Sequence, residues 1–434
     1  MFQKIKSFLL ENQTVRQTVA KNTFWLAVSN IGGRLLRAVI IIYAARVLGA
    51  AEWGVFSYAI GLAALLTIFT DLGIGPTITR ETAKIADPGY KTRILSTAFF
   101  IKLAILAIGV NLVLFIAPHF TSIEKAKMIL PIIAFVLIFD SLRQFGFSLI
   151  QALERMEWEA GLYLITNVAI VAFGFLFLTA SPTVSSFTYA YALGTGVGMA
   201  ATYFVLKDKL TGLFTQFSRK LVRTIFSSAW PFAVSTTMAG LMINTDIILI
   251  GYFLRAEDVG FYSAADRITQ ILYLLPAILA AATFPTIARL TSEGTRVQTA
   301  LERSMGIAFM LALPLALGGL LVAPDLVTLL FGNSYLPATL SLQILFLTMM
   351  LNFPSVFLMN AIFAFNEQKK LVLFAVIGGA TNVILDLILI PFFGIAGSAW
   401  ATFIAQLVSN IYLWRVMKKI GHFAILPRLV RIIP

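Results

Sequence analysis

Apolar runs long enough to cross a bilayer recur along almost the whole chain. A spanning helix needs about 20 mainly apolar residues, and such runs, separated by short polar stretches, extend from residue 22 to residue 416. Only 12% of the residues are charged, about half the share that is usual in a soluble domain. The pattern predicts an all-α integral membrane protein with about twelve transmembrane helices. We place these helices at 22–46, 54–75, 94–117, 129–150, 160–180, 187–206, 225–253, 263–288, 304–323, 339–363, 371–391 and 397–416.

The basic residues between these helices are distributed unevenly. With the N-terminus inside, the predicted cytoplasmic segments hold 24 Lys and Arg residues, and the outer segments hold 4. Positive charge marks the cytoplasmic loops of membrane proteins, so we expect both termini in the cytoplasm and a multi-pass protein of the cytoplasmic (inner) membrane. This topology also explains the net charge of +13 without nucleic acid as a partner.

A short motif recurs in the two halves of the chain. Leu48–Ala59 and Leu254–Ala265 share Leu, Ala, Gly, aromatic, Ser and Ala positions at an offset of 206, and Pro76–Arg80 returns as Pro285–Arg289 at an offset of 209. Both matches fall on corresponding predicted sides of the membrane. The repeat therefore predicts two six-helix bundles related by a pseudo-twofold axis along the membrane normal.

This interpretation divides the chain into five parts. We expect an interfacial N-terminal helix (1–21), an N-terminal bundle (22–206), a basic cytoplasmic connector (207–224), a C-terminal bundle (225–416) and a cytoplasmic tail (417–434). No cleavable signal peptide is expected, because residues 1–21 contain no apolar block.

Basic side chains inside the predicted helices of the first half mark candidate binding positions. A charge at the bilayer centre costs about 2.5–3.5 kcal/mol on insertion scales, so such residues normally face a cavity or a partner. Arg34 and Arg37 lie on one helix face with no acidic residue within one turn, which favours a cavity role. Arg143 follows Asp140 by three residues, and a pair that only neutralises buried charge explains it equally well. The candidates for binding an anionic group such as pyrophosphate are Asn30, Arg34, Arg37, Lys102 and Arg143.

Acidic residues inside the predicted helices form a second set. Intramembrane carboxylates often relay protons or bind coupling cations, so H+ or Na+ coupling is open, as are plain hydrogen-bonded pairs between helices. We expect Arg267 to pair with Asp266 or Asp246. The candidates for coupling or ion pairing are Asp71, Asp140, Asp246, Asp266, Arg267 and Asp386.

The sequence predicts no catalytic or metal site. Cysteine is absent, and the two histidines, His119 and His422, lie in predicted loops far apart. Neither a nucleophile–base pair nor a metal-ligand cluster can be built from these residues. We therefore expect a transporter rather than an enzyme, without a bound cofactor.

Several passages resemble a known family. The stretch 22–84, with Arg46–Gly49, Thr70–Gly75 and Arg80-Glu81, is similar to the opening of the oligosaccharide flippases, and 259–265, 331–335 and 393–399 are further family-like passages. These exporters of O-antigen and polysaccharide units belong to the superfamily that includes lipid II flippases and multidrug-extrusion transporters.

The resemblance implies a V-shaped pair of six-helix bundles around a cationic central cavity. It implies that a polyprenyl-pyrophosphate-linked oligosaccharide moves from the inner to the outer leaflet by alternating access. Lipid and the lipid-linked glycan would be the partners of a monomer, and a glycan polymerase of the same pathway is a further conceivable partner. Twelve predicted helices, rather than the fourteen usual for lipid II flippases, favour the polysaccharide branch.

Other functions fit the sequence less well. A major-facilitator carrier would show a Gly-x-x-x-Asp-Arg-like signature in the loop after the second helix, which here reads GPTITRETAKIADPGYKTR. An ion-coupled multidrug exporter of the same superfamily is the closer alternative, but an acidic cavity would suit its cationic cargo. A membrane glycan polymerase needs a sizeable outer loop, and the longest predicted one, near 324–338, is short. Nothing in the sequence resembles the filter loop of a channel.

Overall fold

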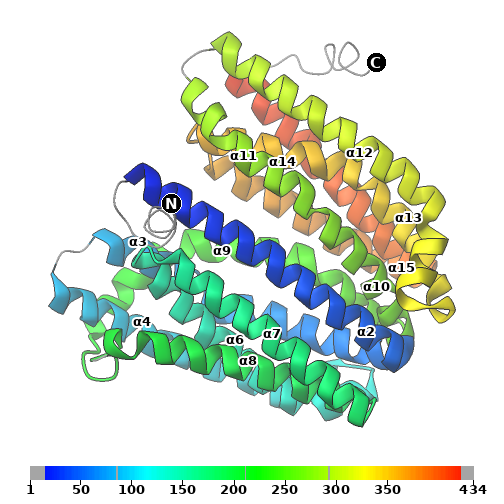
Figure 1. The fold of residues 1–434 in the computed structure, drawn as a ribbon, viewed down its shortest axis with the longest axis horizontal. Helices are drawn as coiled ribbons and strands as arrows, with labels where there is room; N and C mark the ends of the chain where they lie inside the picture. The colour runs from blue at the N-terminus through cyan, green and yellow to red at the C-terminus, as the bar shows by residue number, and fades with distance from the viewer. Residues whose placement is uncertain (1–14, 85–86, 211, 292–293, 422–434) are drawn as a thin grey trace, which may run out of the picture. The chain divides into compact units, whose positions relative to one another are not determined.

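The computed structural model describes residues 15–84, 87–210, 212–291 and 294–421. Within these ranges the chain is almost entirely helical and contains no strand, as predicted (Figure 1). The expected surface helix and the tail lie mostly outside them. The helices are α2 (Val15–Asp71), α3 (Ile74–Lys84), α4 (Pro88–Asn111), α5 (Ala117–Phe120), α6 (Glu124–Ala152), α7 (Met156–Ala180), α8 (Val184–Leu206), α9 (Arg219–Phe253), α10 (Ala256–Leu272), α11 (Leu274–Leu290), α12 (Gly294–Phe331), α13 (Thr339–Leu347), α14 (Met349–Ala364) and α15 (Lys369–Gly421).

The helices agree with a membrane-spanning chain. Every predicted transmembrane segment lies within helical residues, interrupted at most by a short turn or a π-helical turn. Eight helical segments of the described ranges are long and apolar enough to cross a membrane. Two of them, Phe24–Asp71 and Lys369–Ile420, contain 48 and 52 residues, and at about 1.5 Å per residue each is more than twice as long as the roughly 30 Å hydrocarbon core. The count of twelve and the cytoplasmic termini stay predictions.

Glycines divide the two longest helices. Gly49 in α2 has φ 74° and Gly394 in α15 has φ 59°, values that glycine adopts readily and other residues rarely do. Each glycine falls between two predicted transmembrane segments. Each long helix is therefore kinked at one glycine, where the sequence suggested a short loop.

Packing divides the chain into two compact units, residues 1–48 with 59–240 and residues 49–58 with 241–434. In the first unit, α8 packs against both α6 and α7, and α3 packs against α6 (Figure 1). Phe99, Phe145 and Ile150 are buried in its core. Helix α9 contributes to both units, and the predicted connector at 207–224 stays a prediction.

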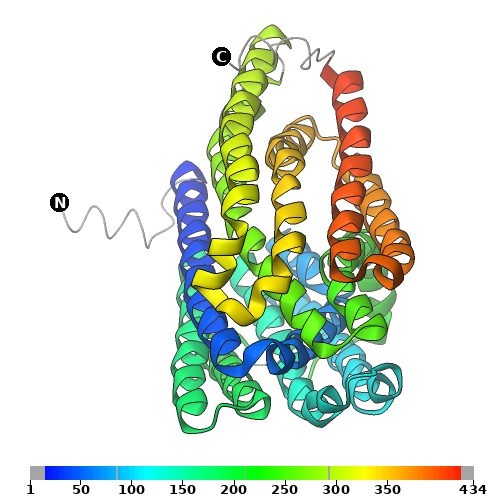
Figure 2. The ribbon, with the colours of Figure 1, turned by 90° about the vertical axis from the view of Figure 1, so that its right-hand side faces the viewer.

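In the second unit, α14 packs against α11, α12 and α15, and α13 packs against α12 and α15 (Figure 2). Leu301, Met305, Leu358 and Leu413 fill its core, and each is fully buried.

The two copies of the repeated motif contact each other within the second unit. A Cβ added to Gly54 would lie 1.6 Å from the carbonyl oxygen of Ala256, and one added to Gly260 would lie 2.0 Å from that of Ala50. Because Gly54 and Ala50 correspond to Gly260 and Ala256 at the offset of 206, the contact is reciprocal. This pseudo-symmetry supports the interpretation of the motif as an internal repeat.

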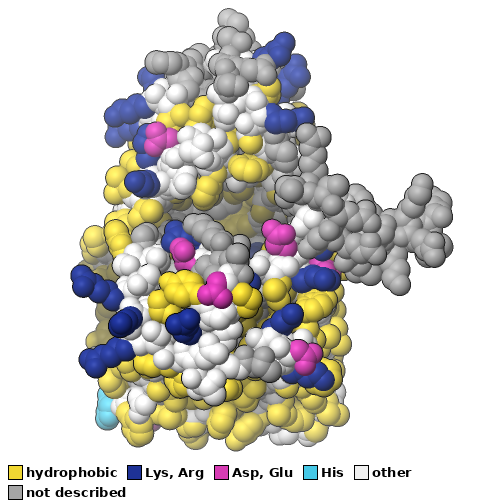
Figure 3. Space-filling model, turned by 90° about the vertical axis from the view of Figure 1, so that its left-hand side faces the viewer, with side chains coloured by type: hydrophobic (Ala, Val, Ile, Leu, Met, Phe, Trp, Pro, Cys, Tyr) yellow, Lys and Arg dark blue, Asp and Glu magenta, His cyan; other side chains and the backbone are white. Residues whose placement is uncertain are grey.

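The outer surface suits a lipid environment. Many large apolar side chains point outward; Leu321 is 81% exposed and Phe204 71% exposed. On the side drawn in Figure 3, dark blue Lys and Arg side chains are more frequent than the magenta acidic ones.

Candidate functional site

Arg37 is held where α2 crosses α7. The crossing is close because Gly33 has no side chain: a Cβ there would lie 2.2 Å from the Tyr163 ring and 2.9 Å from Asn167 Nδ2. One turn after Gly33, Arg37 Nε donates a hydrogen bond of 3.1 Å to Asn167 Oδ1. The guanidinium carbon also lies 5.9 Å from the centroid of the Tyr191 ring on α8, a distance at which a cation is attracted to the ring.

Arg34 lies one turn before Arg37 on the same face of α2, and its side chain is exposed. Within the described residues, no ion pair joins either arginine to a carboxylate. Asn30, the other predicted residue of this helix, is exposed and donates to the carbonyl of Leu26 at 2.8 Å.

Arg143 lies near Arg37 and is almost completely buried. Its Nη2 donates to Asp140 Oδ1 at 2.6 Å along α6. The rings of Phe147 and Tyr163 lie 5.0 and 6.0 Å from its guanidinium carbon, and Asp140 also interacts electrostatically with Arg37. Because Tyr163 contacts both Gly33 and Arg143, α7 links the two arginine positions. We call Arg34, Arg37 and Arg143 the arginine cluster.

Arg143 is only partly satisfied by this pair. Its Nε and Nη1 are buried and have no hydrogen-bond partner. The pair expected from the three-residue spacing is therefore present, yet it leaves donor groups that an anionic ligand could use.

Lys102, also predicted to bind the substrate, is engaged elsewhere. Its Nζ lies 3.1 Å from Asp71 Oδ1 at the end of α2, and its side chain is fully buried. Lys21, likewise buried, lies 2.9 Å from Glu157 Oε2. These two buried lysines, like Arg143, thus have a carboxylate partner, which distinguishes them from Arg34 and Arg37.

The second unit contains a buried pair of aspartates from different helices. Asp246 of α9 accepts a hydrogen bond from the Tyr262 hydroxyl of α10 and one of 2.8 Å from Thr402 Oγ1 of α15. Asp386, also on α15, interacts directly with Asp246 and is 0% exposed. We call Asp246 and Asp386 the aspartate pair.

The surroundings of the aspartate pair are rich in acceptors. By hydrogen-bond geometry among the described residues, both oxygens of Asp386, Oδ1 of Asp246 and Oδ1 of Asn382 are buried without a partner, although Ser398 and Asn382 lie close enough to interact with Asp386 and Asp246. Two adjacent buried carboxylates cannot both stay charged unless a cation or a proton lies between them. The set contains too few acidic or histidine side chains for a typical multivalent-metal site, and no group of three or more such side chains lies together in the described ranges. Oxygen ligands of this kind suit a proton or Na+.

Asp266 and Arg267 are connected indirectly. Gln270 Nε2 donates to Asp266 Oδ2 at 2.6 Å, and Gln270 Oε1 accepts from Arg267 Nη1 at 3.1 Å. In the described part of the chain, Gln270 thus bridges the two residues that the sequence suggested as a pair, and Arg267 also interacts electrostatically with Asp266.

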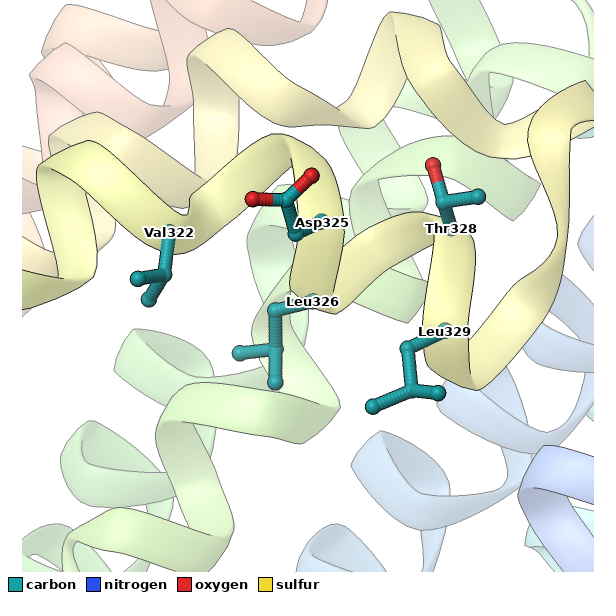
Figure 4. Close-up of a pocket in the computed structure, with 5 residues that line it drawn as sticks. All are labelled: Val322, Asp325, Leu326, Thr328 and Leu329. Carbon is teal, nitrogen blue, oxygen red and sulfur yellow. The ribbon is translucent and has the colours of Figure 1, made fainter.

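The hollows of the two units lie away from these residues. The larger, about 500 Å³, is lined by one stretch of α12. Figure 4 shows Asp325 and Thr328 pointing away from Val322, Leu326 and Leu329, so the polar groups do not converge with the apolar ones. A smaller one of about 140 Å³ lies between α3, α4 and α9 and includes Thr77, Glu81 and Tyr90. The larger hollow therefore lacks the convergent polar groups of a ligand site, and neither hollow includes a residue of the arginine cluster or of the aspartate pair.

Several residues around both sets escaped the sequence analysis. Tyr163, Asn167 and Tyr191 surround Arg37, and Tyr262 and Thr402 surround Asp246. Asn167 carried a readable signal, since it is a polar residue within the apolar segment 160–180. Thr402 follows Ser398 by one turn, as Asp386 follows Asn382.

Comparison with known proteins identifies the family. The family described as "Polysaccharide biosynthesis protein" matches residues 19–291, which is more than half of the chain. The chain belongs to the polysaccharide biosynthesis protein family.

Relatives of this family member cover most of its length. A protein of Haloferax volcanii, described as a probable low-salt glycan biosynthesis flippase, is 25% identical over 91% of this chain and 82% of its own. A candidate O-antigen transporter of Escherichia coli (strain K12) is 23% identical over 89% of this chain and 93% of its own.

Two solved structures share the fold of this family member. The lipid II flippase MurJ in an inward closed conformation superposes with a TM-score of 0.75 at 17% identity, over 93% of this chain and 90% of its own. An inward-facing multidrug resistance transporter of the MATE family gives 0.72 at 15% identity, over 90% and 95%. At these identities the likeness shows the fold alone, and it confirms the predicted class of helical membrane protein.

Proposed function

We propose that this protein is a flippase that moves a polyprenyl-pyrophosphate-linked oligosaccharide from the inner to the outer leaflet of the cytoplasmic membrane. The names of its relatives support a glycan flippase rather than an enzyme. The observation that supports the lipid-linked substrate is the pattern of ion pairs in the first unit. Lys21, Lys102 and Arg143 form ion pairs with carboxylates, whereas Arg34 and Arg37 form none among the described residues, and Arg37 only interacts electrostatically with Asp140.

A charge without a counter-ion in an apolar helix requires another source of stabilisation. An arginine facing hydrocarbon is costly, and Arg34 is exposed on its unit. A water-filled path that admits an anion removes this cost. Guanidinium groups bind phosphate oxygens with two parallel hydrogen bonds, so a pyrophosphate head group suits Arg34 and Arg37. The polyprenyl chain remains in lipid while the glycan crosses by alternating access.

Energy for the cycle would come from a cation bound at the aspartate pair. Asp246 and Asp386 are buried among unpartnered oxygens, and binding H+ or Na+ there would neutralise them. We propose that this cation links transport to an ion gradient. No other cofactor is required, and the transporter acts as a monomer that hands its product to a glycan polymerase.

A multidrug exporter is the second candidate, favoured by the acidic character of the aspartate pair and by the fold shared with a MATE transporter. The two candidate functions differ in the sign of the charge on the transported molecule. A lipid-linked pyrophosphate needs Arg34 and Arg37, whereas a cationic drug would be repelled by them.

The test is transport in proteoliposomes that contain a fluorescent polyprenyl-pyrophosphate-linked oligosaccharide. Replacing both Arg34 and Arg37 with Glu should reduce appearance of the glycan in the opposite leaflet at least about 100-fold, because two attractive charges become repulsive. The matched control replaces Lys220 and Arg223, which have the same spacing and are exposed at the start of α9, with Glu. Full transport by the first variant, or efflux of a cationic dye by the wild type in place of glycan transport, would refute the proposal.

A further inference from the structure

Asp140 is a partly exposed carboxylate that pairs with a buried cation of the first unit. Its side chain is 28% exposed, close to the 26% of Asp71, the partner of Lys102, but unlike Asp71 it lies beside the arginine cluster. Asp140 is held by one ion pair to Arg143 and interacts electrostatically with Arg37. A single accessible carboxylate is thus shared by two of the three members of the arginine cluster.

Arg143 has more donor groups than its contact with Asp140 uses. It gives one hydrogen bond to Asp140, while its Nε and Nη1 are buried without a partner among the described residues. Arg37 gives its Nε to Asn167. The guanidinium groups of the cluster can therefore bind more anionic oxygen atoms than one carboxylate provides.

A second carboxylate lies near but is bound to another group. Glu159 interacts electrostatically with Arg143, and its Oε1 accepts a hydrogen bond of 3.1 Å from Gln151. The cluster's three arginines thus face two carboxylates, Asp140 and Glu159, which leaves one positive charge in excess. A pyrophosphate entering this cluster meets attraction from the arginines and repulsion from Asp140.

We infer that Asp140 is a resident counter-ion that the pyrophosphate head group displaces during each transport cycle. This inference rests on the proposed function. In the empty site Asp140 neutralises Arg143, and when substrate enters the phosphate oxygens take the guanidinium N–H groups. Asp140 then forms its ion pair with Arg143 again as the substrate leaves. A site that must release its cargo cannot bind it too tightly, and a competing internal anion weakens binding in proportion to its own attraction for the arginines.

The test compares pyrophosphate binding to wild-type protein and to Asp140→Asn in detergent by isothermal titration calorimetry, with inorganic pyrophosphate and farnesyl diphosphate as probes. We expect Asp140→Asn to bind both probes about tenfold more tightly, equivalent to about 1.4 kcal/mol, and to transport the lipid-linked glycan more slowly. Adding Arg143→Gln to this variant should remove the gain. The matched control is Glu124→Gln, because Glu124 pairs with Lys127 on the same helix with the same spacing but is 80% exposed. It should leave the affinity unchanged.

The outcomes separate the inference from the proposed function. If Asp140→Asn binds pyrophosphate like the wild type, or gains no more than Glu124→Gln, the counter-ion role is wrong while the flippase proposal stands. If wild-type protein binds neither probe and charge reversal of Arg34 and Arg37 leaves transport intact, the proposed function fails. Asp140→Ser tests the same role with a smaller side chain. Should neither variant fold, as judged by thermal unfolding, Asp140 is a structural partner of Arg143 and the inference is overturned.

Discussion

The buried ion pairs show what sequence spacing can and cannot predict about single residues. Arg143 and Asp140 lie three residues apart on one helix, so their pairing could be read from the sequence and is present in the structure. Lys102 and Asp71 are 31 residues apart and on different helices. Nothing in the local pattern indicates which faces of these helices meet, so the sequence suggested Lys102 as a substrate ligand and did not reveal that Asp71 is its partner.

Removing one member of the Lys102–Asp71 pair should destabilise the protein, whereas removing both charges together should not. Leaving a buried charge without its partner typically costs about 3–5 kcal/mol, whereas removing both charges is often neutral. We expect Asp71→Asn to lower the thermal unfolding temperature in detergent strongly and the double variant Asp71→Asn/Lys102→Met to recover most of the loss. Glu367→Gln, which breaks the exposed pair with Lys370, should change stability by less than about 1 kcal/mol. Equal losses in the single and double variants would contradict this reading.

At the scale of helices, the sequence showed the repeated motif but not the contact between its two copies. The offset of 206 predicted two related segments, yet only the structure shows that they contact each other, Gly54 against Ala256 and Gly260 against Ala50. The helices could be predicted because the length of an apolar run and the polar residues that end it are local properties of the sequence. They give no distances between helices, since these depend on which small residues face each other.

Gly54 should not tolerate even a methyl group. An added Cβ would lie 1.6 Å from a backbone carbonyl oxygen, which cannot swing aside as a flexible side chain could. We expect Gly54→Ala to destabilise the protein by about 1–3 kcal/mol, the usual cost of overpacking, measured as a lower unfolding temperature in detergent. Gly161→Ala is the matched control within α7, because nothing lies within 4 Å of its Cβ position, and it should be neutral or slightly stabilising. Equal behaviour of the two variants would show that the helices separate without cost.

For the whole molecule, composition and apolar runs were sufficient for the class of protein, and the motifs within 22–84 and 259–265 for the family it resembles, but neither showed how the proposed coupling site is assembled. Asp246 and Asp386 were both singled out from the sequence as intramembrane acids. Their partnership depends on α9, α10 and α15 meeting in the second unit, which no local pattern encodes. For Arg34 and Arg37 of α2 the sequence was more informative, because the absence of an acidic residue within one turn can be read directly from the local sequence.

The aspartate pair predicts how transport responds to an ion gradient. Asp386→Asn removes one of the two buried carboxylates, so the cation should lose its main ligand. We expect glycan transport by this variant to become independent of an imposed Na+ or H+ gradient, while affinity for pyrophosphate stays within about twofold of wild type, since the arginines are unchanged. Asp325→Asn, an exposed carboxylate of α12, should retain the gradient dependence. A gradient response that survives in Asp386→Asn would exclude the aspartate pair from coupling.

The buried pairs also bear on how the chain enters the membrane during synthesis. Asp71 leaves the ribosome before Lys102, so its partner is already present when Lys102 reaches the translocon, and the two segments can partition into lipid as a neutral unit. Lys21 has the opposite order, because Glu157 is synthesised much later. Until then Lys21 must stay in water at the cytoplasmic edge, where its predicted position would place it. Early segments of this protein would thus be held back from final burial until α7 has been made.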